Sequence, residues 1–254
     1  MNYGLYSSAT GVLANSYRQD VIANNLANVE TVGFKKDLVS FREYLTEARL
    51  RGLNPRRHSN AMLEELGGGL AVAPTKVDLS QGDLEQTGNP TDVALDGAGF
   101  FAVRHGRQVM LTRDGRLAVN RDGQLIRITG GEPVLDEKLN PINVTPGATI
   151  AMGKDGTVWQ NGQMAGRMGV FDVSRPEMLV KKGSLLFEVK NAEKEIRPGS
   201  AEVRGGMLER ANVDPATSLA ELMETQRQLE ANANMIRMHD QMLARVVNDV
   251  GKIS

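Results

Sequence analysis

The 254-residue chain contains no cysteine. This absence excludes disulfide bonds, thiolate catalysis and cysteine-ligated metal, but it leaves the compartment open. Aromatic residues make up only 4% of the chain, which argues weakly against a sugar-binding cleft. An excess of one charge is also missing, because 30 Lys and Arg residues nearly cancel 31 Asp and Glu residues. Since nucleic-acid binding has a basic excess as its signature, we expect no nucleic-acid partner.

Long hydrophobic runs are missing as well. No run approaches the roughly 18 apolar residues that a membrane span needs. Residues 1–5 show neither the basic segment nor the apolar segment of a cleavable secretory signal. If the chain leaves the cytoplasm, we expect it to use a route other than the ordinary signal.

Motifs for catalysis or cofactor binding are scarce. His58, His105 and His239 lie in different zones, and none has a second histidine at ligand spacing, so no metal site is expected. Residues 97–103 begin like a dinucleotide-binding loop, but position 102 is alanine and the loop leads into a strand-like segment. No P-loop and no G-x-S-x-G motif occurs. We therefore expect no catalytic residue, no cofactor and no small-molecule substrate. The alternative, a discrete periplasmic binding protein or enzyme, stays open because carboxylates are plentiful. It is less favoured because no catalytic motif is found.

Two stripes with a seven-residue period run along residues 2–29. One stripe holds Leu5, Val12, Gln19 and Leu26, and its companion holds Ser8, Asn15, Ile22 and Val29. Proline is absent from this segment. The pattern predicts an amphipathic helix with a weak seam, because half of its seam positions are small or polar. Gly33 is expected to cap its C-terminus.

The C-terminal segment has the clearest period in the chain. Its rows, each with a spacing of seven, are Leu222, Leu229, Ile236, Leu243 and Val250, and then Leu219, Gln226, Ala233, Asp240 and Val247. Asp214 before Pro215 suits an N-cap followed by proline at the first helical position. A helix of about 35 residues is roughly 50 Å long and needs a partner along most of its length. The polar seam residues either fix register in a buried seam or lie in a partly hydrated one.

The middle of the chain is expected to be β-rich. Asp-Gly occurs at 96–97, 114–115, 122–123 and 155–156, and Asn-Gly occurs at 161–162. Such dipeptides suit tight turns, and the short alternating segments between them predict an antiparallel meander. An arginine cluster within residues 42–74 lies close to several glutamates and is interpreted as a solvated loop.

The predicted fold class is α+β, with long N- and C-terminal helices forming a coiled-coil-like core and a β-rich domain inserted between them. The predicted divisions are 1–41 (helix and signature), 42–74 (linker), 75–210 (β-rich outer domain) and 211–254 (heptad helix).

Three blocks of the sequence resemble the flagellar rod and hook family. Residues 20–36 read DVIANNLANVETVGFKK and are similar to its N-terminal signature, A-N-N-L-A-N-x-x-T-x-G-F-K. Residues 92–101 with 112–115 resemble the start of its central β-domain, and residues 212–243 resemble its C-terminal helix. The signature residues are Ala23, Asn24, Asn25, Leu26, Ala27, Asn28, Thr31, Gly33, Phe34 and Lys35.

The resemblance implies a structural subunit of the bacterial flagellar basal-body rod, which crosses the periplasm and transmits torque. It implies export through the flagellar type III apparatus without a cleaved signal. Its expected partners are that apparatus, copies of itself and other rod proteins. The terminal helices would pack into concentric tubes through an assembly seam of Leu5, Val12, Leu26, Leu222, Leu229, Ile236, Leu243 and Val250. Chain length and the first residues favour a proximal rod subunit, whereas the stretch 42–74 resembles distal rod subunits, and both stay open.

Overall fold

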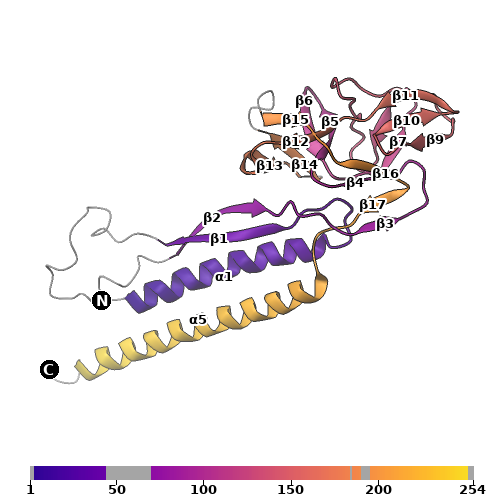
Figure 1. Ribbon diagram of the computed structural model, residues 1–254. Helices are drawn as coiled ribbons and strands as arrows, with labels where there is room; N and C mark the ends of the chain where they lie inside the picture. Colours follow the sequence, from indigo (N-terminus) through magenta and orange to yellow (C-terminus); the bar gives the residue numbers. More distant parts are fainter. Residues whose placement is uncertain (1–2, 44–69, 184, 190–194, 251–254) are drawn as a thin grey trace. The chain divides into compact units, whose positions relative to one another are not determined.

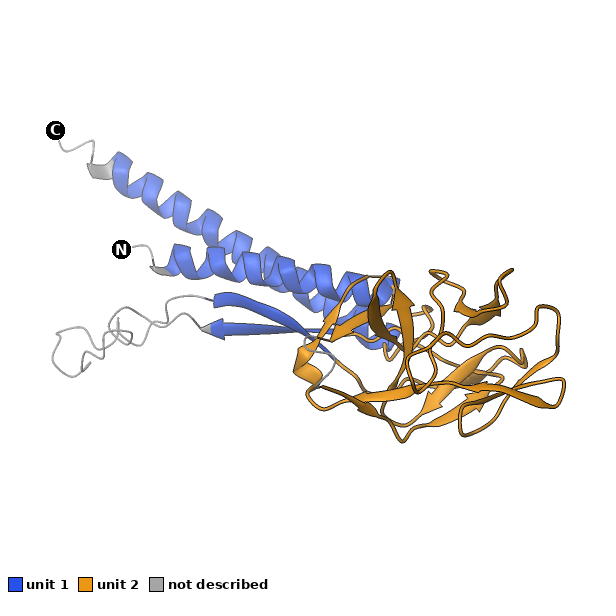
Figure 2. Cartoon of the chain, turned by 90° about the horizontal axis from the view of Figure 1, so that it is seen from above, with its two compact units in different colours: residues 1–27, 37–77, 214–254 blue, residues 28–36, 78–213 orange. Residues whose placement is uncertain are grey.

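A computed structural model describes residues 3–43, 70–183, 185–189 and 195–250. The chain forms two compact units, shown in different colours in Figure 2. We call the first the helical unit; it comprises residues 1–27, 37–77 and 214–254. The second is the β unit, which comprises residues 28–36 and 78–213. The two ends of the chain therefore belong to one unit, and the β unit interrupts it in sequence.

Two helices dominate the helical unit: α1 (Tyr3–Ala27) and α5 (Pro215–Val250). They lie against each other and run antiparallel (Figure 1). Asp214 caps α5 as the sequence predicts, because its Oδ1 accepts a hydrogen bond from the Ala216 N–H at 3.1 Å. Glycine permits the close approach of the helices. A Cβ atom on Gly11 would lie only 2.9 Å from the side-chain nitrogen of Asn232.

A two-stranded antiparallel hairpin, β1 (Asp37–Glu43) and β2 (Leu70–Val77), also packs on α1. Alternation along β2 explains its position: Ala73 is buried, while Leu70 and Val72 point outward and are exposed. Asn25 of α1 holds the start of the hairpin. Its side-chain amide donates to the Asp37 carbonyl at 2.9 Å and accepts from the Asp37 N–H at 2.9 Å.

The predicted coiled-coil-like core is wrong. Within the described residues the helical unit has only these two long helices, and they do not mesh through two apolar rows. The less exposed positions of α5 include Leu222, Leu229 and Ile236, but the row beside them is Ser218, Thr225, Asn232 and His239. Polar side chains against glycines replace the second apolar row that a coiled coil needs. Beyond His239, every described side chain of α5 is exposed.

The β unit is built from antiparallel strands, as the turn pattern predicts. Its largest sheet has six strands in the order β13 (Leu179–Lys181), β14 (Leu186–Val189), β6 (Gln108–Thr112), β5 (Phe100–His105), β12 (Val170–Val173) and β15 (Ile196–Pro198). A three-stranded sheet has the order β11 (Gln163–Arg167), β10 (Thr157–Gln160) and β9 (Ile150–Met152). Two-stranded pairs are β16 (Glu202–Gly205) with β4 (Val93–Asp96), β17 (Met207–Glu209) with β3 (Leu84–Gln86), and β7 (Leu117–Val119) with β8 (Leu125–Arg127). A 3-10 turn spans Pro176–Met178.

One apolar core holds these sheets together. Its buried members come from several sheets and include Val93, Leu95, Phe101, Leu125 and Val158. The glycines of four predicted turns, at 97, 123, 156 and 162, adopt positive φ. Gly115 differs, because its need for glycine is steric: a Cβ atom there would lie 1.6 Å from the Val93 carbonyl oxygen. In the part of the chain that the structure describes, no helix is long and apolar enough to cross a membrane.

Candidate assembly surfaces

An apolar stripe on α5 is the most extensive candidate contact surface. Met235, Met238, Met242 and Val246 are spaced by three or four residues and are all exposed, so they share one helix face. The large apolar side chains exposed on α5 are Leu219, Met223, Met235, Met238, Met242, Leu243, Val246 and Val247. A soluble monomer rarely exposes an apolar patch of this kind without a function. Leu243 and Val247 extend the apolar surface around the helix, and Leu219 and Met223 lie nearer its start, so the eight residues do not all share one face. We call these eight residues together the α5 stripe.

A second apolar surface lies on the outer face of the hairpin. Phe41 of β1 is paired in register with Val72 of β2, and both side chains are exposed. Leu38 and Leu70 are exposed as well. Cross-strand apolar pairs stabilise a sheet when a partner covers them. We call these four residues the hairpin face.

The seam residues predicted from the sequence are divided between covered and uncovered positions. Leu5, Val12 and Leu26 of α1 are partly buried, as are Leu222, Leu229 and Ile236 of α5. Leu243 is exposed, and the side chain of Val250 lies outside the described residues. Six of these eight residues therefore contribute mainly within the chain, and their role between subunits stays a prediction. Sequence reasoning missed Met235, Met238 and Met242, although their helical spacing was visible.

The signature residues stand where α1 ends and the chain passes into the β unit. Ala23, Asn24 and Ala27 are exposed, whereas Asn25 is buried against the hairpin. Asn28 and Thr31 form a turn, in which the Thr31 N–H donates to the Asn28 carbonyl at 3.0 Å. This turn follows directly on α1.

Gly33 is not the helix cap that the sequence suggested, because α1 already ends at Ala27. Gly33 has φ +69°, and a Cβ atom there would lie 2.5 Å from the backbone carbon of Arg113. Its N–H donates to the Glu209 carbonyl at 2.8 Å. Only glycine fits, since both the dihedral angle and the space exclude a side chain.

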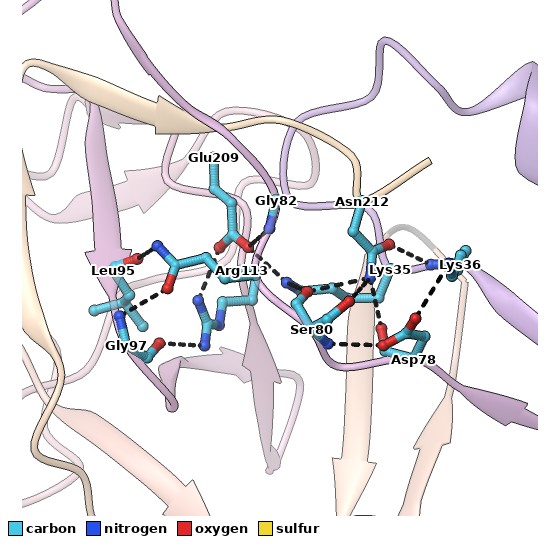
Figure 3. A network of polar contacts seen from close by, with 11 residues as sticks. Lys35, Lys36, Asp78, Ser80, Gly82, Leu95, Gly97, Arg113, Glu209 and Asn212 are labelled. Carbon is cyan, nitrogen blue, oxygen red and sulfur yellow. Dashed lines mark hydrogen bonds and ion pairs between the residues drawn. The ribbon is translucent and has the colours of Figure 1, made fainter. Parts of the chain in front are cut away.

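Lys35 begins a buried polar network (Figure 3). Its ammonium group is only 1% exposed and donates to Glu209 Oε1 at 2.5 Å and to the Ser80 carbonyl at 2.6 Å. Glu209 is fully buried and also accepts from Arg113 at 2.8 Å and from the Gly82 N–H at 2.9 Å. Burial lowers the pKa of Lys35, and the attraction of Glu209 opposes this shift.

Asn212 and Asp78 extend the network. The Asn212 side chain accepts from the Lys36 N–H at 2.8 Å and donates to the Asp78 carbonyl at 3.0 Å and to Ser80. Lys36 also forms an ion pair with Asp78 at 3.3 Å. The network therefore joins residues 33–36, 78–82 and 209–212, which are the segments of the β unit next to its chain connections with the helical unit.

An aromatic contact completes this region. The Lys181 ammonium group lies 4.4 Å from the centre of the Phe34 ring, and Phe34 packs with Ala211 and Val213. The signature residues Gly33, Phe34 and Lys35 thus all contact the segment that leads into α5 or the strands beside it. The sequence did not predict Glu209 and Arg113 as their partners. Arg113 does lie within residues 112–115, one of the segments that resemble the flagellar rod and hook family.

Comparison with known proteins identifies relatives along the whole chain. Residues 5–35 match the family model "Flagella basal body rod protein", residues 94–160 match "Flagellar hook protein FlgE/F/G D1 domain", and residues 204–249 match "Flagellar basal body rod FlgEFG protein C-terminal". The chain is 31% identical to the flagellar basal-body rod protein FlgF of Caulobacter vibrioides over 100% of both chains. It is 30% identical to FlgF of Mesorhizobium japonicum over 93% of each chain. It is also 30% identical to the rod protein FlgG of Bacillus subtilis, over 96% of this chain and 97% of that protein.

Proposed function

Because the chain belongs to the flagellar basal-body rod protein family, we propose that it polymerises through its helical unit into the torque-transmitting shaft of the rod. Members of this family are structural proteins of the basal body and not enzymes. The chain is accordingly a structural rod subunit that assembles with other flagellar basal-body rod proteins.

The observation that carries the proposal is the uncovered α5 stripe. Its eight side chains are each roughly half exposed. Complete burial of such a side chain contributes about 1.5–3 kcal/mol, so covering the remaining half contributes about 1 kcal/mol each. The stripe could thus supply on the order of 8 kcal/mol. Association itself costs about 4–15 kcal/mol, which is of similar size, so one stripe alone gives at most a weak pair. We infer that each subunit contacts several neighbours.

The contact is proposed to be heterologous. The α5 stripe is a helix face rich in methionine, and the hairpin face is a flat pair of strands bearing Phe41 and Val72. A stripe that docks on the hairpin face of another copy leaves one stripe and one hairpin face free at the two ends, so the contact can repeat from copy to copy. We propose that the rotation between copies does not close into a ring. Such contacts generate helical polymers. The concentric packing of terminal helices predicted from the sequence would follow from this geometry.

Two finer elements of the proposal rest on family membership. The first is export through the flagellar type III apparatus without a cleaved signal. The second is a position in the proximal part of the rod. Relatives named FlgF and relatives named FlgG match at similar identity, 31% and 30%, so identity does not separate proximal from distal. The two FlgF relatives match over 100% and 93% of this chain and the FlgG relative over 96%, so coverage does not separate the two positions either. The proposed proximal position rests on the length and the first residues of the chain, as the family resemblance implies.

Replacing Val247 with aspartate tests the proposal. Val247 is 69% exposed, so Val247→Asp is expected to leave the folded monomer unchanged in circular dichroism and thermal unfolding. In the cell we expect loss of swimming and truncated rods in electron micrographs, because a charge placed in a buried contact costs several kcal/mol. Gln241→Asp adds the same charge at an exposed polar position of α5 and serves as the matched control.

The point at which rod growth stops distinguishes a proximal from a distal position. Rods that stop before any proximal segment forms would support the proximal position, and rods that stop after it would support the distal one. Normal rods and swimming in the Val247→Asp strain, with the variant protein present in them, would refute assembly through the α5 stripe.

A further inference from the structure

Methionine gives the α5 stripe a chemical reactivity that a purely aliphatic stripe would lack. We propose that hydroperoxides oxidise the unassembled chain at four methionines of α5, and that the resulting sulfoxides exclude that copy from the rod. The part of this inference that concerns the rod rests on the proposed function. We call these residues the α5 methionines; they are Met223, Met235, Met238 and Met242.

Exposure separates the methionines of the chain into accessible and protected ones. The α5 methionines are between 46% and 53% exposed, so a small oxidant in water can reach their thioether groups. Met164 of β11 is the one other exposed methionine among the described residues. Met110 and Met168 are buried in the core of the β unit. In the part of the chain that the structure describes, most of the accessible methionine therefore lies on α5.

No thiol competes with these thioethers for the oxidant. Cysteine thiolates are readily oxidised by peroxides, and the chain has no cysteine. Its twelve methionines therefore hold all of its sulfur. Oxidation of the free chain is directed to the exposed methionines, and mainly to those of α5.

The reaction needs no cofactor and no catalytic residue. A lone pair of the methionine sulfur attacks one oxygen of hydrogen peroxide, so that an S–O bond forms and the O–O bond breaks. The proton of the transferred hydroxyl group passes to the departing hydroxide, which leaves as water. The sulfur is oxidised to a sulfoxide, and the peroxide is reduced by the same pair of electrons.

Sulfoxides would change the stripe with little effect on the fold of the chain. Met235, Met238 and Met242 share an exposed helix face, so a polar oxygen on each of them stays in contact with water in the free chain. In a contact between subunits the same oxygen would be buried, and burying a polar group without a hydrogen-bond partner is costly. The modification therefore acts on assembly more than on folding.

Assembly should end this sensitivity. Once a neighbouring copy covers the stripe, peroxide no longer reaches the thioethers, so the modification is confined to copies that have not yet joined the rod. Methionine sulfoxide reductase can restore such a copy, because this oxidation is reversible. The rod would then be built from unmodified chains.

Mass spectrometry of the unaltered chain tests the inference in cells. The chain is induced in a deletion strain that lacks methionine sulfoxide reductase, so that the modification persists. A short pulse of hydrogen peroxide, ended by catalase before the new chain is found in basal bodies, is adjusted to add about one oxygen atom per chain. Rods are then allowed to form, and sulfoxide is measured at each methionine in basal bodies and in the unassembled pool. Met164 is the internal control, because it is exposed but lies in the β unit, away from α5.

We expect sulfoxide at the α5 methionines to be about tenfold rarer in basal bodies than in the unassembled pool, since a small loss of contact free energy shifts occupancy by this factor. Sulfoxide at Met164 should be equally frequent in both fractions. Equal frequencies of α5 sulfoxide in the two fractions would overturn the inference and leave the rod function standing. Oxidation of the α5 methionines no faster than that of Met110 and Met168 in the free chain would overturn it too.

Leucine substitutions provide the matched variants. Met223→Leu, Met235→Leu, Met238→Leu and Met242→Leu together keep apolar character, size and helix propensity. This variant should enter rods after the pulse as it does without one, whereas Met164→Leu should respond like the unaltered chain. A fourfold variant that the pulse excludes as strongly as the unaltered chain would overturn the inference.

Peroxide applied to isolated basal bodies tests the proposed function separately. If the α5 methionines react there as fast as in the free chain, assembly through the α5 stripe is refuted. If the chain is absent from basal bodies without any pulse, the rod function itself fails.

Discussion

Glu209 is the residue whose loss should harm the β unit most. Among the described residues, its carboxylate is the one that forms ion pairs with both Lys35 and Arg113, at 2.5 and 2.8 Å. Glu209→Gln keeps the shape and an acceptor for the Gly82 N–H, but it removes the carboxylate that two buried cations share and leaves Lys35 only the weaker attraction of Asp78. Removing one partner of a buried ion pair costs about 3–5 kcal/mol.

Lys35→Met provides the comparison within the same network. After this change Glu209 still has Arg113 and the Gly82 N–H as partners. The loss is then two charge-assisted hydrogen bonds, to Glu209 and to the Ser80 carbonyl, and it is offset by removal of the desolvation cost of the buried ammonium group, so we expect less destabilisation than for Glu209→Gln. The asymmetry between the two substitutions, and not the size of either alone, is the signature of a carboxylate shared by two cations.

Urea unfolding of the full chain measures both changes. Trp159 lies in the β unit and is the only tryptophan, so its fluorescence follows that unit specifically. With a urea dependence of about 2 kcal/mol per molar, Glu209→Gln should lower the midpoint by about 2 M. Glu85→Gln is the matched control, because Glu85 pairs with Arg210 at 3.8 Å on the surface and should change stability by less than about 1 kcal/mol.

Raising the pH should weaken the Glu209→Gln effect. Burial lowers the pKa of Lys35. Without Glu209 to favour its charge, Lys35 in the folded variant loses its proton at lower pH than it does in the unfolded chain. The unfolded state then binds more protons, so stability of the variant rises with pH below the ordinary pKa of lysine. A cost for Glu209→Gln no larger than that for Lys35→Met would refute the shared-carboxylate reasoning.

Two further predictions concern Gly33 and the cap of α5. Gly33→Ala should destabilise the β unit by several kcal/mol more than Gly88→Ala in the same urea assay. Both glycines have φ near +70°, but only the Cβ at Gly33 meets backbone, at 2.5 Å, and equal costs would contradict this. Asp214→Asn tests the cap: the Thr217 hydroxyl and then the Ala216 N–H lower the pKa of Asp214. The stabilisation that the Asp214 carboxylate contributes is fully present above 3.8, the pKa of this group in the unfolded chain. It is lost as the pH falls through the lower pKa of Asp214 in the folded chain. The difference in thermal midpoint between wild type and Asp214→Asn should therefore shrink in acid, and a constant difference would refute the assignment.

The helices were predictable because their period is long and regular. The expected segment 2–29 corresponds to α1 over Tyr3–Ala27, and the segment after Pro215 corresponds to α5. The repeat did not reveal which row lies beside Leu222 and Leu229. The expected companion Leu219 is exposed, and Ser218 and Thr225 take its place. A spacing of seven fixes the period but not the identity of the covered row, which depends on the glycines of the opposing helix.

The polar network could be predicted only in part. The signature at residues 20–36 named Gly33 and Lys35, but it could not name their partners. Glu209 lies 174 residues from Lys35 in sequence, and nothing local marks it as the carboxylate that Lys35 contacts. A buried lysine does demand a counter-charge, so the need for a partner was foreseeable while its position was not. The proposed divisions of the chain at 41, 74 and 210, and the seam as a contact between subunits, stay predictions.

The order in which the helical unit can fold follows from its interrupted sequence. Gln19 of α1 donates to Gln226 of α5 across 207 residues of chain. Contacts between residues so distant in sequence form slowly, because a long loop must close before they contribute. If the chain becomes available N-terminus first, α1 therefore has no helical partner until α5, near the other end of the chain, is available. A segment with the weak seam of α1 is marginal as an isolated helix in water. We expect the helical unit to be the last part of the molecule to become ordered, and its formation to report that the whole chain is present.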